Sequence, residues 1–368
     1  RNSINGVLRL FVIYQGINKM NLTGSLMSRD LIIGKVVDGN LTEKNETLLP
    51  LYFKRRTNVS SWLQLRAADC SRPNIILLKR MMGISDYDDV STVLKVHGAV
   101  ITDTYWFKAE NENITYDEIK FKDNRYCQLA LIGNTDNLEL GYQKTPELTN
   151  IGSYEKCWRI VDDQWWLYKR ENDMERFSEL FIYYFGKALG LNMASYQLDG
   201  LYIRSLDFTN SATLNFESAY SLVGDNEDYQ TNFKVFNNLS ADLSKAYLGM
   251  LYMDTLCLNM DRHTQNYGVL RDPMTGKIIS FSPLFDHNIA LLSRGYPQVS
   301  RKNDLMIKLF TNLISDNPTA RKQFEELKCP AINKETICNC LKMIPLPVNN
   351  QFMINYTLNG TRQIDERI

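Results

Sequence analysis

Short apolar runs separated by turn-forming residues characterise the first third of the chain and predict a mixture of strands and helices. The predicted strands are residues 8–15, 30–37 and 99–107, and the predicted helices are residues 75–82 and 86–94. The second strand ends in the pair Asp38-Gly39, which is typical of a turn. The pattern indicates a globular α/β region, and it contains no spacing of residues that is typical of catalysis.

The pattern is clearer between residues 128 and 207. Aromatic and β-branched residues predict strands, which are residues 157–160, 165–169 and 197–203. The first two flank Asp162-Asp163, which predicts a tight hairpin. Apolar residues at helical spacing predict a helix over residues 172–189, and Gly190 supplies its stop signal.

Helical spacing dominates the last part of the chain. The predicted helices are residues 241–258, 305–315, 319–328 and 334–343. The sequence therefore predicts an α+β fold with two lobes, in which a mixed α/β N-terminal portion precedes a mainly helical C-terminal lobe. We expect an N-terminal α/β subdomain of unknown role at residues 1–125, a small lobe at 126–207 and a helical lobe at 208–368.

Composition narrows the function classes. The 368 residues carry 42 Lys and Arg against 42 Asp and Glu, so the formal net charge is zero and no direct binding of nucleic acid is expected. Because no apolar run reaches about 18 residues, no membrane association is expected either. Seven scattered cysteines, an odd number, indicate a reducing compartment and unpaired thiols, so we expect a cytoplasmic protein. The chain begins with Arg1, and we expect a leader or a short native N-terminus before it.

One stretch, residues 259–286, contains Asp and Asn residues whose order and spacing are typical of a catalytic site. Asp261 is followed by Asn266, and after a predicted hairpin the chain reaches Asp286. Phosphoryl transfer requires an Asp near the acceptor hydroxyl, together with an Asn and a second Asp that hold Mg²⁺ against the phosphates of ATP. Oxygen atoms of these side chains are the ligands that Mg²⁺ prefers. The order and spacing therefore predict an ATP- and Mg²⁺-dependent phosphotransferase.

Two other interpretations of this stretch are open. The string could be a coincidence or the remains of an inactive site, because Asp and Asn in loops usually cap helices and turns. A zinc hydrolase is the other interpretation, with His263, His287 and Asp286 as ligands. No H-E-x-x-H spacing supports it. Cys338 and Cys340 also lack a nearby His, and they make a poor zinc site.

The string Asp261-Arg262-His263 with Asn266, followed by residues 283–286 (PLFD), resembles the HipA-like serine/threonine kinases. Their core also resembles phosphatidylinositol 3- and 4-kinases, and the resemblance covers about residues 130–330. It implies a two-lobed protein-kinase-like fold, with nucleotide bound by the small lobe and catalysis by the helical lobe. It implies further that Asp261 is the catalytic Asp, that His263 supports the catalytic loop, and that Asn266 and Asp286 bind the metal.

The resemblance also implies a nucleotide site in the small lobe. Lys169, at the end of an aromatic strand, would bind the α- and β-phosphates, and Glu179 in the next helix would lie near it. A loop with a single glycine, Gly152, would cover the phosphates, and Ser153 is the positional candidate for autophosphorylation. Lys156 could add a charge near the γ-phosphate or be an ordinary solvated lysine.

The adenine would be recognised where the lobes join. We expect the backbone from Ile203 to Ser205 to bind the base, with Asp207 near the ribose; a plain linker is the alternative.

The resulting hypothesis is an ATP/Mg²⁺-dependent serine/threonine protein kinase with a protein substrate. By the resemblance it would autophosphorylate and pair as a toxin with an antitoxin or other regulatory protein. The alternatives are a phosphatidylinositol or small-molecule kinase on the same core, and a catalytically inactive kinase-like binding module.

Overall fold

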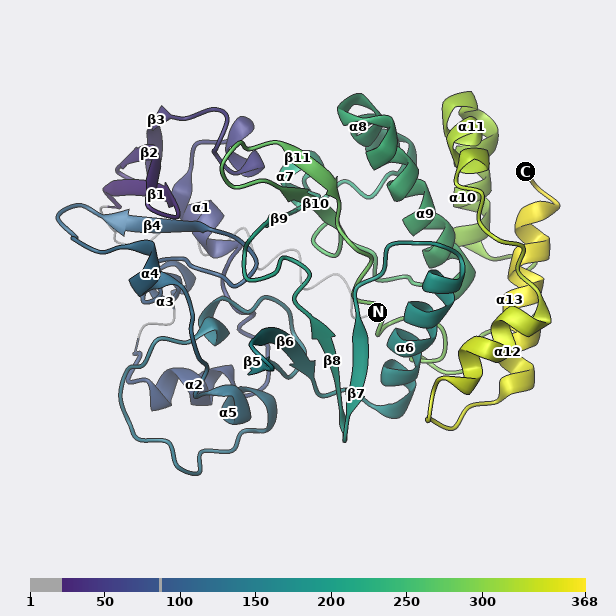
Figure 1. The fold of residues 1–368 in the computed structure, drawn as a ribbon, viewed down its shortest axis with the longest axis horizontal. Helices are drawn as coiled ribbons and strands as arrows, with labels where there is room; N and C mark the ends of the chain where they lie inside the picture. Colours follow the sequence, from purple (N-terminus) through teal and green to yellow (C-terminus); the bar gives the residue numbers. More distant parts are fainter. Residues whose placement is uncertain (1–21, 86–87) are drawn as a thin grey trace, which may run out of the picture.

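The computed structural model describes residues 22–85 and 88–368. The strand predicted at residues 8–15 and the start of the helix predicted at 86–94 lie outside this part of the chain. The remaining elements form three antiparallel sheets and a set of helices, as the two-lobed α+β prediction requires (Figure 1).

The first sheet has the strand order β3-β2-β1-β4. Its strands are β1 (Gly24–Ser28), β2 (Leu31–Val37), β3 (Asn40–Lys44) and β4 (Tyr105–Ala109). The Asp38-Gly39 turn joins β2 to β3, and both residues have positive φ. The strand predicted at residues 99–107 begins only at Tyr105, because the preceding residues cross to another part of the molecule. There the carbonyl of Thr102 accepts a hydrogen bond from the backbone of Phe216.

Short helices pack around this sheet. They are η1 (Leu51–Lys54), α1 (Val59–Gln64), α2 (Ile75–Met81), α3 (Asp89–Leu94), α4 (Tyr116–Ile119) and α5 (Cys127–Ile132). One of the cores that they enclose joins Trp106 to Leu129, Leu148 and Trp165. This core includes residues on both sides of position 125, and the domain boundary at that position stays a prediction.

A disulfide joins Cys127 to Cys157 and fastens α5 to the second sheet. This corrects the expectation that all the cysteines are unpaired. The free cysteines are Cys70, Cys257, Cys329, Cys338 and Cys340.

The second sheet has the order β5-β6-β8-β7. Its strands are β5 (Lys156–Val161), β6 (Gln164–Lys169), β7 (Tyr196–Asp199) and β8 (Tyr202–Leu206). The predicted Asp162-Asp163 hairpin is confirmed, and both of these residues have positive φ. The single strand predicted at residues 197–203 is wrong, because Gly200 has a φ of +60° and turns the chain into a second hairpin.

Helix α6 (Asp173–Ala188) follows β6 and confirms the predicted helix. Asn172 caps its N-terminus in a capping box with Glu175. Gly190 has a φ of +76°, as expected of a residue that stops a helix. Three stacked rings from the apolar face of α6, Phe177, Phe181 and Phe185, lie in the largest core.

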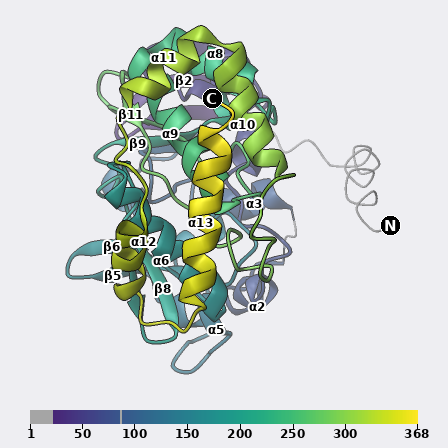
Figure 2. The same cartoon turned by 90° about the vertical axis from the view of Figure 1, so that its right-hand side faces the viewer.

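The remainder of the chain forms the helical lobe and a third sheet of order β11-β10-β9. The strands are β9 (Asn215–Ser218), β10 (Gly268–Arg271) and β11 (Ile278–Phe281). The helices are α7 (Tyr220–Val223), α8 (Tyr229–Leu239), α9 (Ala241–Cys257), α10 (Leu305–Asp316), α11 (Pro318–Glu326), α12 (Lys334–Lys342) and α13 (Asn350–Asp365). One further short helix, η2 (Pro146–Thr149), comes earlier in the chain, before β5. Helix α9 is buried on nearly every side and forms the centre of the lobe. Helices α12 and α13 lie side by side on its flank (Figure 2), where α12 contacts α6 and α13 contacts α9.

Arg271 fastens the first sheet region to the helical lobe. Its guanidinium pairs with Glu217 and donates to the carbonyls of Thr47 and Leu49, and all of these groups are buried or half-buried. Glu217 also accepts hydrogen bonds from the Tyr105 hydroxyl and from the backbone of Leu51. Because every charged group here is paired, the N-terminal portion is held against β9 and β10 in a fixed orientation.

Candidate active site

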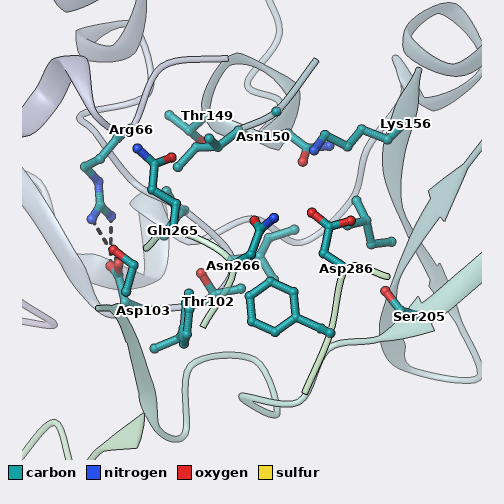
Figure 3. Close-up of a pocket in the computed structure, with 18 of the residues that line it drawn as sticks. Arg66, Thr102, Asp103, Thr149, Asn150, Lys156, Ser205, Gln265, Asn266 and Asp286 are labelled. Carbon is teal, nitrogen blue, oxygen red and sulfur yellow. Dashed lines mark hydrogen bonds and ion pairs between the residues drawn. The ribbon is translucent and has the colours of Figure 1, made fainter. Parts of the chain in front are cut away.

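A cavity of about 540 Å³ lies where the three sheets meet. Most of the residues that the sequence singled out line it, and these are Gly152, Ser153, Lys169, Ser205, Asp207, Asp261, His263, Asn266 and Asp286. Figure 3 shows Lys156, Asn266 and Asp286 converging on its centre. The volume is within the range of pockets that hold small molecules.

Lys169 is the centre of a buried charge cluster. Its Nζ lies 2.8 Å from Glu179 Oε1 and 2.7 Å from Asp286 Oδ1. Glu179 does not line the cavity but stands behind Lys169, fully buried, and its other oxygen accepts the backbone N–H of His287 at 3.0 Å. The fold thus joins the end of β6, the middle of α6 and the segment after β11 through a single ammonium group.

The charges of this cluster stabilise one another. Burial by itself would raise the pKa of the Asp286 carboxyl, but Lys169 and Lys156 hold it well below its usual range. Burial would likewise lower the pKa of Lys169, yet the surrounding carboxylates raise it well above the ordinary value. Asp286 is therefore ionised and Lys169 protonated at neutral pH, as a metal ligand and a phosphate-binding cation need to be.

Glu171 is a carboxyl that the sequence did not single out. It is buried, and its Oε1 lies 3.5 Å from Lys169 Nζ, but neither of its oxygens has a hydrogen-bond partner. Burial raises the pKa of this side chain to about 8. At neutral pH it is mainly an uncharged acid beside the charged cluster.

The expected catalytic loop, residues 258–266, is held from behind by an ion pair. Helix α9 ends at Cys257, and the loop begins at the next residue, Leu258, which has a φ of +51°. Arg262 makes a bidentate pair with Asp254 of α9, through Nε at 2.8 Å and Nη2 at 3.0 Å. Its Nη1 donates to the carbonyls of Asn266 and Phe285, each at 2.7 Å. One buried guanidinium therefore sets the position of Asn266 relative to Asp286.

The residues beside the loop have the donor chemistry of a Mg²⁺ site. The Nδ2 of Asn266 donates to the carbonyl of Asp261 at 3.3 Å, so the amide oxygen is the end that could ligate a metal. Asp286 has a φ of +60°, a conformation that costs energy for a residue with a side chain, and its backbone N–H is fixed by the Tyr196 hydroxyl at 3.0 Å. A carboxylate and an amide oxygen on one cavity wall fit a hard divalent cation.

The loop of residues 150–156 covers the cavity near these groups. Lys156 and Lys169 are direct partners across β5 and β6, and both line the cavity. Gly152 has a φ of +106°, and a Cβ on it would come within 2.2 Å of Lys156 Nζ. Burial lowers the pKa of Lys156 to about 8, against the opposite effect of Asp286. The glycine therefore makes room for a buried cation under the loop, which is not an ordinary solvated lysine.

Two residues that the sequence analysis missed hold this loop at both ends. Arg72, from the N-terminal portion, donates to the carbonyls of Asn150 and Lys156, each at 3.0 Å. It also pairs with Glu147 at 2.5 Å, and both side chains are almost completely buried. Glu147 accepts in turn from the side chain of Asn150 at 3.0 Å and from the backbone of Trp158 at 2.8 Å.

The expected adenine site needs correction. Ile203 and Ser205 lie in β8, which pairs with β6 on one side and with β7 on the other, so their backbone groups are used within the sheet. Ile203 is fully buried and does not line the cavity, whereas Ser205 does. The residues that leave the sheet and line the cavity are Leu206, Asp207 and Phe208.

Asp207 also has a local role that limits its use at a ribose. Its carboxylate accepts from the backbone and hydroxyl of Thr209, at 2.9 and 2.6 Å, and from the backbone of Ser211 at 2.7 Å. These bonds stabilise the turn after β8. Contact of the Asp207 side chain with a nucleotide stays a prediction.

The two histidines near the acids lie in different environments. His263 is exposed on the catalytic loop, and its Nδ1 accepts from the backbone of Gln265 at 3.3 Å. His287 is fully buried, with Nδ1 3.7 Å from Glu179 Oε2. Within residues 22–85 and 88–368 no group of three His, Cys, Asp or Glu side chains could hold a metal ion, so the zinc interpretation is wrong there.

No protein-family model matches the chain, and no curated protein matches its sequence. Among solved structures it is similar to HipA of Shewanella oneidensis MR-1 in a complex with HipB and operator DNA. That likeness has 14% identity and a TM-score of 0.54, and it covers 93% of this chain and 96% of the other. The fold is that of the HipA-like kinases. A proinflammatory kinase from Helicobacter pylori, CtkA, is similar over 58% of this chain and 95% of its own, with 15% identity and a TM-score of 0.43.

In the described residues, no helix combines the length and apolar character that a membrane span requires.

Proposed function

We propose that this chain is an ATP- and Mg²⁺-dependent serine/threonine protein kinase. One observation supports the proposal above the others. Lys169 pairs with both Glu179 and Asp286 at hydrogen-bond distance, and Asp261 and Asn266 line the same cavity. Lys169 and Asp286 are 117 residues apart in the sequence. Burying so many charges together is costly, so stabilising the fold is a poor explanation for the cluster.

In this proposal each group has a separate task. Asp261 orients the hydroxyl of the acceptor and accepts its proton, and the hydroxyl oxygen forms a bond to the γ-phosphorus. The bond from that phosphorus to the oxygen bridging the β- and γ-phosphates breaks, and ADP leaves. Lys169 and Lys156 hold the phosphates, while Asn266 and Asp286 would hold Mg²⁺. The metal, when bound, neutralises negative charge on the phosphates.

Labelled ATP provides the test. Wild-type protein is incubated with γ-labelled ATP and Mg²⁺, and the product is analysed by mass spectrometry beside the variants Asp261→Asn and Asp286→Asn. We expect label on a serine or threonine in the wild type and a loss of about 10²–10⁴-fold in Asp261→Asn, as for removal of a catalytic acid–base group. Asp286→Asn removes a proposed metal ligand and should also lose most of the label. Ser153, exposed on the phosphate loop, is the proposed site of autophosphorylation. Equal labelling in both variants would sink the assignment.

The same assay separates the alternatives. Label that enters phosphatidylinositol vesicles, and neither this protein nor added protein, would indicate a lipid kinase. ATP binding without turnover would indicate an inactive binding module. The complete set of charged groups around Lys169 favours turnover.

We further propose a regulatory protein partner. The similar Shewanella HipA was solved with HipB and operator DNA, as a toxin–antitoxin system. If this chain acts as such a toxin, its expression stops bacterial growth, and Asp261→Asn abolishes that effect. Equal growth inhibition by wild type and variant would contradict a toxic kinase activity.

A further inference from the structure

The cavity extends beyond the expected phosphate-binding groups toward the N-terminal portion. We call this end of the cavity the side chamber, and its walls come from the N-terminal portion, from β9 and α7, and from the catalytic loop. The residues that line it are Tyr52, Trp62, Arg66, Asp103, Tyr105, Ser218, Tyr220, Ser221 and Gln265. The five from the N-terminal portion are 3–7% exposed, so this wall of the recess is almost completely screened from solvent.

The side chamber lies beyond the metal-binding residues as seen from β8. In Figure 3, Ser205 lies at one end, Asp286 and Asn266 are central, and Gln265 separates them from the Arg66–Asp103 pair at the other end. Gln265 belongs to the loop between Asp261 and Asn266, so the chamber opens directly beside the catalytic loop. A group bound there is adjacent to the reacting hydroxyl and distant from the β8 end of the cavity.

The charges that line the side chamber are neutralised by the protein itself. Arg66 makes a bidentate pair with Asp103, at 2.8 and 2.9 Å, and its remaining N–H groups donate to the carbonyls of Gly98 and Tyr105. The guanidinium also stacks over the ring of Trp62, 4.4 Å from its centroid. A phosphate or carboxylate therefore finds no unpaired cation among these residues.

Aromatic rings and hydroxyl groups provide the rest of the surface. Tyr52 and Tyr220 sandwich the guanidinium of Arg56, at 4.8 and 5.3 Å, which joins the N-terminal wall to α7. The Tyr105 hydroxyl is used by Glu217 at 3.0 Å. Such a recess favours a flat or apolar side chain over a charged one, because burying an unpaired charge is costly.

We infer that the side chamber binds the acceptor, and that the acceptor is a polypeptide segment with a large uncharged side chain, aromatic or aliphatic, next to its serine or threonine. The inference rests on the proposed kinase function. It assigns the side chains of Tyr52, Trp62, Arg66, Asp103 and Tyr105 the role of selecting the substrate. The acceptor hydroxyl lies at Asp261, and the neighbouring side chain lies between Trp62 and Tyr220.

The test uses three synthetic peptide pools with a serine at the centre. The residues that flank the serine are Phe and Leu in the first pool, Glu in the second and Lys in the third. We expect kcat/KM for the Phe/Leu pool to exceed that for either charged pool by about tenfold or more, as burial of one large apolar side chain allows. Phosphatidylinositol vesicles serve as a fourth substrate. Equal use of the three pools, or label in lipid only, would overturn the inference, while autophosphorylation measured in parallel reports on the kinase function separately.

Two variants test whether the preference for Phe and Leu depends on the side chamber. Ser221→Phe fills the chamber from its half-buried rim and should reduce kcat/KM for the Phe/Leu pool about tenfold with KM for ATP unchanged. The control, Thr231→Phe, makes the same type of change at an exposed position outside the cavity and should alter neither value. A rise in KM for ATP in Ser221→Phe without an effect on peptides would assign the chamber to the nucleotide instead.

Asp103→Asn changes the charge of the chamber without changing its shape. The variant leaves Arg66 without its carboxylate partner, so the Glu pool should gain at least tenfold relative to the Lys pool. A thermal melt shows whether the variant folds. A folded variant with unchanged preference would contradict the placement of the acceptor beside Arg66.

Discussion

The proposed catalytic loop and the N-terminal portion contribute to one cavity, but the residues that they contribute are spaced very differently along the sequence. The loop supplies Asp261 and Asn266, and the segment after β11 supplies Asp286, all within one stretch of 26 residues. The N-terminal portion supplies Arg66, Arg72 and Asp103 from separate turns with no characteristic spacing. The groups proposed to react are thus local in sequence, whereas the groups that hold or surround them are distant from one another.

The difference shows what each type of residue depends on. A catalytic string has a defined geometry because its members must contact the same phosphate groups. A residue such as Arg72 needs only to reach two carbonyls of a loop more than 75 residues away, and many positions in a fold could do this. Variants in the two regions should therefore differ in the kinetic constant that they change.

After Asp261→Asn and Asp286→Asn, the largest effect is expected from Lys169→Met. The change removes the cation between Glu179 and Asp286, and transfer of label from ATP should fall about 10²–10³-fold, as for loss of one electrostatic stabiliser. Lys187→Met, an exposed change on α6, is the control and should leave activity intact. If the two variants retain similar activity in the γ-labelled ATP assay, the charge cluster has a structural role only.

Much of the fold could be predicted where the signal is local. The hairpin at Asp162-Asp163 and the cap of α6 at Asn172 follow from residues that adopt those conformations in any protein. Helix α13 was missed, because its Asn, Thr and Gly residues have low helix propensity. Packing on α9 and α12 stabilises it, and such long-range contacts are not visible in a sequence window.

The same distinction applies to the candidate site. Lys169 and Glu179 could be singled out because a strand and the following helix place them ten residues apart. Glu171 was overlooked, since nothing in its neighbours indicates that a carboxyl so near a helix start is fully buried. The backbone from Ile203 to Ser205, which the sequence predicts to bind adenine, is used within the sheet because β7 pairs with β8. The sequence predicts one continuous strand in place of that hairpin.

A smaller effect, on a different constant, is expected from Glu147→Gln. The variant keeps the shape of the side chain but weakens its charged bond to Arg72, so the loop of residues 150–156 should be held less firmly. Loss of a hydrogen bond between charged groups is worth about 1.5–3 kcal/mol, which corresponds to a rise in KM for ATP of about 10–100-fold. The rate at saturating ATP should change much less.

The matched control is Glu139→Gln, an exposed position outside the cavity. Steady-state kinetics over a range of ATP concentrations checks both variants. A fall in kcat with KM unchanged in Glu147→Gln would place this pair among the groups that act in the reaction and would weaken the contrast between the two regions.

The smallest effect is expected in thermal stability, from Glu171→Gln. The pKa of Glu171 is about 8 in the folded protein, because of burial, against 4.5 for the free side chain. Between these values the folded state binds more protons than the unfolded state, so the contribution of Glu171 to stability falls as pH rises from about 4.5 to 8. Glutamine resembles the protonated acid and does not titrate.

Glu171→Gln should therefore melt close to the wild type at pH 5.5 and a few degrees above it at pH 8. Glu46→Gln, at an exposed position, should show no change of this kind between the two pH values. Melting curves recorded without nucleotide measure the effect of this carboxyl on the fold alone. A variant that melts below the wild type at pH 8 would mean that ionised Glu171 stabilises Lys169, and the cluster would then hold three charged carboxylates around one ammonium group.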